Sequence, residues 1–260
     1  MNDQPAANPP RYGIDPYLDW VAKEGLNVAE DYGIDLFKVE TKMWPRYGVK
    51  GAAVHLKGRG DFCNMFLIDV PPGGSTAPQK HLYEDVYYVL EGHGSTQLEF
   101  PDGSKRSFEW GPKALFAIPL NCKYRLHNGS GQTPARFVSI NTIPIVYNLF
   151  RDSSFIFNNT HNFDRIAANA EPTDEVVYKP DANHTRTAVN LHETMFVRDI
   201  YETHRTAFVE RGAGRTVYLE LANSVISAHV AENPGLHVNN PHRHGPSAFV
   251  FTLQGQGYTI

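Results

Sequence analysis

Two stretches of this chain repeat one pattern of residues at a fixed separation, and this repeat limits the folds that the chain can adopt. Moving the first stretch, residues 79–94, forward by 163 positions places Gln79 on His242 and His81 on His244. The same shift aligns further pairs, which are Gly51 with Gly214, Val54 with Val217, Leu56 with Leu219, Pro71 with Pro234, Gly92 with Gly255 and Gly94 with Gly257. An internal repeat of this kind predicts two copies of one structural unit.

The second copy contains two histidines separated by one residue. His242 and His244 point to the same face if their segment is an extended strand. An apolar run at residues 249–253 follows them and is predicted to be a strand, which ends in a Gly-x-Gly turn. Two imidazoles on one strand face beside an apolar strand suit the mouth of a β-barrel that holds a metal ion.

Short β-type runs separated by Gly, Pro and Asn fill the chain after Gly51. The predicted strands of the first copy are residues 52–57, 64–70, 84–90, 95–99, 114–118, 124–127 and 136–141. In the second copy they begin with residues 216–221 and 224–230. Many short strands with no alternation of strands and helices predict an all-β sandwich or barrel.

The remaining segments differ in texture from these strands. Asp15 and Pro16 provide an N-cap and a proline at the first helical position, and Gly25 ends the predicted helix. Residues 191–197 are expected to be a short extended segment that docks on a barrel. The predicted division is 1–50 for a tail and helical arm, 51–145 for the first barrel, 146–211 for a connection and 212–260 for the start of a second barrel.

Composition excludes several classes of protein. The 260 residues are 41% hydrophobic and 20% charged, which is ordinary for a globular chain. A net charge of −4 gives no reason to expect nucleic acid or an anionic membrane as a partner. The sequence has no apolar run long enough for a membrane span and no signal-peptide core. Cys63 and Cys122 match neither a zinc spacing nor a disulfide framework, so we expect buried thiols and a cytoplasmic location.

The order of the motifs resembles that of the cupin superfamily, duplicated as in bicupins. In both copies a Gly/Pro-rich turn precedes the histidine strand, and in the first copy Gly111, Pro119 and Asn128 follow in the family's order. The resemblance covers residues 51–141 and 214–260. It implies a duplicated double-stranded β-helix, or jelly-roll, barrel, and a divalent metal held by three histidines and a glutamate.

In the first copy, the family's ligand positions fall on residues that are mostly poor ligands. They are Gln79, His81, Asp85 and Tyr124. Glutamine and tyrosine are weak partners for a metal that is coordinated by imidazole. We therefore interpret the first barrel as a degenerate site, kept for its packing and its polar lining.

In the second copy, His242 and His244 match the family, whereas Ala248 stands at the glutamate position. This run is similar to that of gentisate 1,2-dioxygenases and related bicupins that cleave salicylate or hydroxynaphthoate, whose iron is held by three histidines without a carboxylate. The third histidine would fall 163 positions after Tyr124, beyond Ile260. Either the chain is a fragment with an incomplete second barrel, which we favour, or another chain completes that barrel.

Two functions follow from the resemblance. The first is ring cleavage of a hydroxylated aromatic acid by Fe(II) or another divalent metal, in a protein that forms homo-oligomers. Three protein ligands leave three positions of an octahedron for a chelating acid and dioxygen. The alternative is a non-catalytic bicupin that binds a small molecule or serves as an accessory protein. A histidine on the strand after the second proline-containing turn would favour the first.

Overall fold

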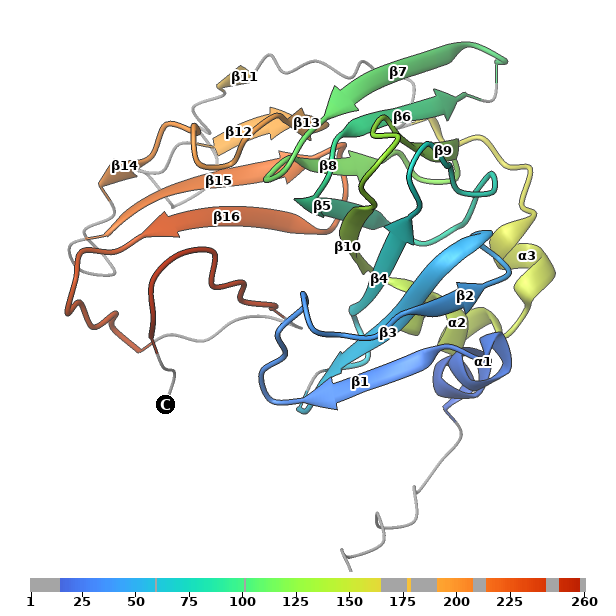
Figure 1. Cartoon of the computed structure of the whole chain (residues 1–260), viewed down its shortest axis with the longest axis horizontal. Coiled ribbons are helices and arrows are strands. Elements are labelled where there is room, and N and C mark those ends of the chain that lie inside the picture. Colours follow the sequence, from blue (N-terminus) through green and yellow to red (C-terminus); the bar gives the residue numbers. More distant parts are fainter. Residues whose placement is uncertain are drawn as a thin grey trace, which may run out of the picture.

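The computed structural model describes residues 15–58, 60–100, 102–164, 177–178, 191–207, 214–241 and 248–257. Their strands form three sheets (Figure 1). The largest sheet contains β1 (Asn27–Asp31), β2 (Lys42–Trp44), β3 (Val49–Leu56), β4 (Asn64–Val70), β5 (Asp85–Glu91), β8 (Leu115–Ile118), β10 (Ala135–Asn141) and β13 (Phe196–Val197). A smaller sheet contains β6 (Gly94–Glu99), β7 (Lys105–Trp110) and β9 (Lys123–Asn128). The third contains β11 (Val177–Tyr178), β12 (Leu191–Thr194), β14 (Thr206–Ala207), β15 (Arg215–Leu221) and β16 (Ser227–Glu232).

The largest sheet and the sheet of β6, β7 and β9 enclose one apolar core. In the largest sheet β3, β4, β10, β5 and β8 lie side by side in that order, and each neighbouring pair is antiparallel. Phe66 and Phe137 from this sheet are buried in the same cluster as Leu98 and Trp110 from the smaller one. The jelly-roll barrel of all-β type that the sequence predicts is therefore confirmed by the strand order.

The predicted strands of the first barrel all form, and their ends differ from the prediction by three residues at most. The sequence does not predict β7, because four of its six residues are polar and exposed and only Phe108 and Trp110 are buried. It also misses β1 and β2, whose side chains are mostly exposed. Strands with little apolar content are hard to recognise from alternation alone.

The predicted first helix is α1 (Pro16–Glu24). The Asp15 carboxylate accepts a hydrogen bond from the Leu18 N–H at 3.0 Å, and Gly25 ends the helix with a φ of 68°. Two further helices, α2 (Ile143–Phe150) and α3 (Ser153–Phe157), follow β10. The backbone N–H of Tyr17 donates to Asn148 Oδ1 at 2.8 Å, which joins α1 to α2 beside the barrel. Among the described residues, none of the helices has both the length and the apolar content that crossing a membrane requires.

The second copy of the repeat lies against the outer face of the largest sheet. In β15, Val217, Leu219 and Leu221 are buried in one cluster with Met65 and Leu67 of β4. The partner of Val217 in β16 is Val230, whereas Val54 in the first copy pairs with Met65, so the two registers differ by two residues. A shift of two leaves each side chain on its original face. The central strands of the largest sheet are thus buried on both faces.

Two further contacts join β15 and the segment that precedes it to the first barrel. The predicted docking segment forms β12 and β13, and β13 pairs with β8, where Phe196 lies opposite Phe116. The Glu84 carboxylate accepts hydrogen bonds from the Ser224 hydroxyl and from the Val225 N–H, the latter at 2.5 Å. The turn between β15 and β16 is therefore held at the start of β5.

The apolar run at residues 249–253 is not the strand that the sequence predicts. Its backbone is irregular, and Tyr201 donates from its hydroxyl to the Leu253 carbonyl oxygen at 2.9 Å. Phe249 and Phe251 pack at the margin of the cluster around Val217. Among the described residues no strand lies beside this run, and a strand needs a neighbour to satisfy its backbone groups.

We expect Gly94→Ala to destabilise the first barrel by about 2–3 kcal/mol, the usual range for an overpacked core. A methyl group there would lie 1.9 Å from the His127 carbonyl oxygen and 2.7 Å from the Trp110 ring, so β6 would have to move away from both neighbours. Denaturant unfolding measures the change. Gly111→Ala is the matched control, because nothing lies within 4 Å of its added methyl group. Equal stability of the two variants would contradict the prediction.

Candidate functional site

Three of the four ligand positions in the first barrel meet inside it. His81 lies just before β5, Asp85 is the first residue of β5, and Tyr124 lies on β9. The fourth, Gln79, is paired with Tyr124 through their backbones, but its side chain turns away and donates to the Arg46 carbonyl oxygen at 2.9 Å. The structure therefore brings together His81, Asp85 and Tyr124 and leaves Gln79 outside.

Both ring nitrogens of His81 have hydrogen-bond partners. Nδ1 lies 2.8 Å from the Tyr83 carbonyl oxygen, which can only accept, so Nδ1 carries a proton. Nε2 lies 3.1 Å from the Tyr124 hydroxyl and 3.5 Å from Asp85 Oδ2. The imidazole is also stacked on the Tyr83 ring, with 3.6 Å between ring centroids and 1° between planes. These contacts fix the ring in one orientation.

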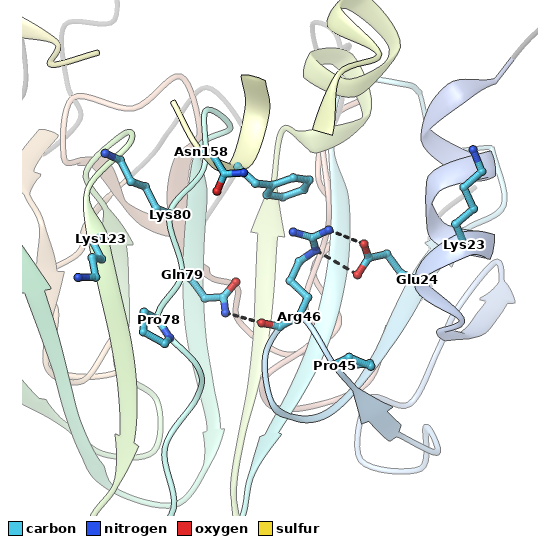
Figure 2. A pocket seen from close by; sticks show the side chains of 10 residues that line it. Lys23, Glu24, Pro45, Arg46, Pro78, Gln79, Lys80, Lys123 and Asn158 are labelled. Carbon is cyan, nitrogen blue, oxygen red and sulfur yellow. Dashed lines mark hydrogen bonds and ion pairs between the residues drawn. The ribbon is translucent and has the colours of Figure 1, made fainter. Parts of the chain in front are cut away.

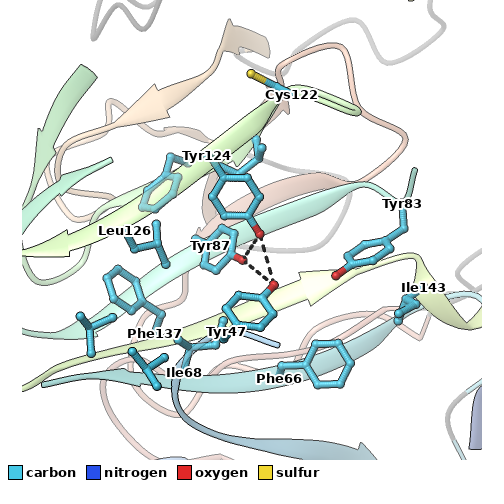
Figure 3. Packing of buried hydrophobic residues seen from close by; sticks show 14 of the residues in the cluster. Tyr47, Phe66, Ile68, Tyr83, Tyr87, Cys122, Tyr124, Leu126, Phe137 and Ile143 are labelled. Atoms are coloured by element: carbon cyan, nitrogen blue, oxygen red, sulfur yellow. Dashed lines mark hydrogen bonds between the residues drawn. The ribbon is translucent and has the colours of Figure 1, made fainter. Parts of the chain in front are cut away.

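Three tyrosine hydroxyls meet next to His81 (Figure 3). The hydroxyl oxygen of Tyr124 lies 2.7 Å from that of Tyr87 and 3.2 Å from that of Tyr47. The hydroxyl oxygens of Tyr47 and Tyr87 are 3.3 Å apart. These side chains are at most 1% exposed, so the triangle is sealed from solvent.

Asp85, at the start of β5, completes this network. Its Oδ1 accepts from the Ser139 hydroxyl at 2.5 Å, and its Oδ2 accepts from the Tyr124 hydroxyl at 3.4 Å. Asn141 in turn donates to Ser139 Oγ at 3.0 Å. The carboxylate is thus buried with hydrogen-bonding partners on both oxygens, which is the condition under which a buried acid is tolerated. We call His81, Asp85, Tyr47, Tyr83, Tyr87, Tyr124, Ser139 and Asn141 the barrel network.

The barrel network keeps its tyrosines protonated. Burial raises the pKa of Tyr47 to about 12, and the negative charge of Asp85 acts in the same direction. Burial, and then Asp85, also hold the pKa values of Tyr87 well above the ordinary value. The pKa values of Tyr83 and Tyr124 are raised as well, and burial is again the largest cause. Hydroxyls in this state donate and accept hydrogen bonds but are not nucleophiles or anionic metal ligands at neutral pH.

The barrel network does not fit a divalent metal. It contributes one imidazole, and the nitrogen of that ring that faces the barrel centre already meets the Tyr124 hydroxyl. No group of three or more His, Cys, Asp or Glu side chains that could hold a metal occurs among the described residues.

A second set of candidate ligands belongs to the second copy of the repeat. His242 and His244 fall outside the described residues, and the predicted third ligand falls beyond Ile260. Ala248, which stands at the glutamate position, is exposed. The segment leading to the histidines is irregular and exposed, and there His237 Nε2 lies 3.1 Å from Asn239 Oδ1. The metal site predicted here stays a prediction.

Sequence reasoning missed two parts of the barrel network. Tyr47 lies in the turn between β2 and β3, in a segment predicted only to be an arm, and no spacing connects it with His81. Ser139 lies on the predicted strand of β10, where it reads as one polar residue in an apolar run. Its inward orientation follows from the alternation along β10, on which Phe137 also faces the core.

Comparison with known proteins finds partial matches among solved structures and leaves the activity open. No family model matches the sequence. No curated protein matches it either. An oxalate decarboxylase from Lactobacillus farciminis is 13% identical with a TM-score of 0.35, over 46% of this chain and 40% of that chain. The Cnp3 cupin domain of Schizosaccharomyces pombe is 14% identical with a TM-score of 0.36, over 46% of this chain and 79% of that chain.

A third solved structure is a salicylate 1,2-dioxygenase from Pseudaminobacter salicylatoxidans. It is 16% identical with a TM-score of 0.31, over 35% of this chain and 24% of that chain. The matched part is thus less than half of the decarboxylase and about a quarter of the dioxygenase. By its own strand order, the first barrel is a jelly roll.

Proposed function

We propose that this chain belongs to a two-barrel, metal-dependent oxygenase that cleaves the ring of a hydroxylated aromatic acid. His242, His244 and a third histidine beyond Ile260 would hold the metal, which we take to be Fe(II). The observation that carries the proposal is the contrast between the two copies. In the first copy the barrel network occupies three of the four ligand positions and Gln79 the fourth, whereas the second copy retains both histidines of the motif.

The contrast assigns different roles to the two barrels. The first barrel is a scaffold, since its core is closed and the outer face of its largest sheet packs against β15. The second copy is held on that face, and its histidine motif follows β16 by a short segment. A metal with three protein ligands would orient the carboxylate and hydroxyl of an aromatic acid beside dioxygen.

Metal content tests this proposal in protein that extends through a complete second repeat. Replacing a residue that hydrogen-bonds to a metal ligand lowers metal affinity about 10–100-fold. Loss of a ligand itself, as in His242→Ala, is therefore expected to lower iron affinity at least about 10–100-fold. His81→Gln is the matched control in the first barrel and is expected to keep its iron. Loss of iron from the His81→Gln protein, with iron retained in His242→Ala, would overturn the assignment.

Oxygen uptake separates the proposed activity from binding alone. Iron-loaded protein is expected to consume dioxygen with at least one member of a panel of hydroxybenzoates that includes gentisate and salicylate. The His242→Ala variant is expected to show none. Iron binding without oxygen uptake on any of these acids would favour the non-catalytic bicupin instead.

A further inference from the structure

A groove of about 720 Å³ lies outside the sealed core of the first barrel (Figure 2). Its walls come from the end of α1, the turn after β2, the segment before β5, the start of β9 and the end of α3. Four cationic side chains line it, together with a single carboxylate, that of Glu24. The cations are Lys23, Arg46, Lys80 and Lys123.

Arg46 is held in one position at the centre of this groove. Its Nε and Nη2 donate to the two carboxylate oxygens of Glu24 at 3.0 and 2.5 Å. Trp44 Nε1 donates to the same carboxylate at 2.8 Å and fixes it in turn. The guanidinium also lies 3.8 Å from the centre of the Phe157 ring. These contacts leave Nη1 as the guanidinium nitrogen that no hydrogen bond within the described residues uses.

A second polar group faces the groove beside Arg46. Gln79 is only 5% exposed, and its side-chain amide nitrogen donates to the backbone carbonyl oxygens of Arg46 and Ala77. Its carbonyl oxygen therefore points the other way, into the groove, as Figure 2 shows. Asn158 lies across from it with a carboxamide that makes no hydrogen bond within the described part of the chain.

The charges around these groups are only partly neutralised. Glu24 forms an ion pair with Arg46. Lys123 forms an ion pair at 3.2 Å with Glu99, a residue that does not line the groove. Lys23 and Lys80 form no ion pair with the residues that the structure describes. A concave surface lined by charge of one sign raises the local concentration of counter-ions. An anion would meet a pre-oriented guanidinium there without any rearrangement of Arg46.

We propose that this groove, defined by Arg46, Gln79, Lys80, Lys23 and Asn158, is a binding site for a small polyanion of the phosphate or polycarboxylate class. An oxyanion group binds Arg46 Nη1 and the Asn158 carboxamide, and the lysines balance the remaining charge. The Gln79 carbonyl oxygen accepts from a hydroxyl of the ligand. The site requires no metal and none of the residues of the second copy, so it is independent of the proposed oxygenase activity.

Calorimetric titration with inorganic phosphate and, separately, with citrate tests the site, in low-salt buffer that contains EDTA. Saturable binding of at least one of the two is expected, and the tighter one identifies the phosphate or the carboxylate class. The double variant Lys23→Gln/Lys80→Gln is expected to weaken binding about tenfold, since two of the four positive charges that line the groove are removed. Lys105→Gln, an exposed lysine of β7 that does not line the groove, is the control and is expected to change the affinity less than about twofold.

Arg46→Lys gives a second, independent readout. Lysine keeps the positive charge but has neither the planar fork nor the stacked surface, so affinity is expected to fall about tenfold. Denaturant unfolding of the same variant shows whether the barrel remains folded. The proposal is overturned if neither anion binds, if Lys105→Gln weakens binding as much as the double variant does, or if the folded Arg46→Lys protein binds with unchanged affinity.

Discussion

Raising the pH above 10 is expected to unfold the first barrel in one steep transition, in which its buried tyrosines ionise together. Burial raises the pKa of Tyr47 to about 12 and holds those of Tyr83, Tyr87 and Tyr124 well above the ordinary value of 10. In the unfolded chain the same hydroxyls titrate near 10. Between pH 10 and about 12 the unfolded chain therefore loses these protons while the folded barrel retains them.

The sign of this difference determines the direction of the effect. A group whose folded pKa is raised stabilises the fold fully below its unfolded pKa, and the stability is lost as pH rises toward the folded pKa. Each such group contributes up to about 1.4 kcal/mol per pH unit, so four tyrosines together contribute up to about 5.6 kcal/mol per pH unit. A domain is stable by only about 5–15 kcal/mol, so one or two pH units are sufficient to unfold it.

The two buried thiols act in the same direction. Burial raises the pKa of Cys63 and of Cys122 from 9 to about 12. Their contribution is therefore lost from about pH 9 upward, which makes the onset of unfolding earlier.

Tyrosinate absorbance and circular dichroism, recorded on the same samples, measure the transition. The two signals are expected to change together. Tyr32 is exposed and lies outside the barrel network. Tyr32→Phe is the matched control and is expected to leave the unfolding pH unchanged. Gradual titration of every tyrosine near pH 10 with the sheet signal intact would contradict the expectation.

The strands of the first barrel could be predicted because burial leaves a clear pattern in them. In β4, Phe66 and Ile68 face the barrel core while Met65 and Leu67 face β15 and its neighbours. Burial on both faces makes such a strand apolar throughout, which is easy to recognise. β7 has one exposed face and a charged sequence, so the same method fails there.

The candidate site was less predictable, because contacts between distant segments determine it. The ligand positions of the first copy follow from the repeat, and their poor ligands predict a degenerate site. Nothing in the sequence places the Tyr47 hydroxyl beside His81. That placement depends on the tight turn at Gly48, which has a φ of 67° and donates its N–H to the Trp44 carbonyl oxygen at 2.9 Å.

Tyr124→Phe is expected to destabilise the first barrel by about 3–4 kcal/mol, since each buried polar group left without a partner costs about 1–3 kcal/mol. The change removes one oxygen atom and keeps the ring. It takes from His81 Nε2 its 3.1 Å partner and from the Tyr87 hydroxyl its 2.7 Å partner, which leaves Tyr87 only the longer, 3.3 Å contact with Tyr47. Asp85 retains Ser139 and therefore loses less. Denaturant unfolding measures the loss.

Tyr32→Phe removes the same atom from a side chain that is 80% exposed, and it is expected to change stability by less than about 0.5 kcal/mol. A loss below about 1 kcal/mol in Tyr124→Phe would show that water or a rotated hydroxyl satisfies the network, and that the barrel is less sealed than its geometry indicates.

Iron binding by the same variant connects this network with function. Tyr124→Phe frees Nε2 of His81, but one imidazole beside a single carboxylate is too few ligands for a stable metal site. The folded variant is therefore expected to bind no more iron than the parent protein when both carry His242→Ala. A gain of iron in the double variant would mean that the Tyr124 hydroxyl alone had been excluding a metal, and the first barrel would then have to be considered as a second metal centre.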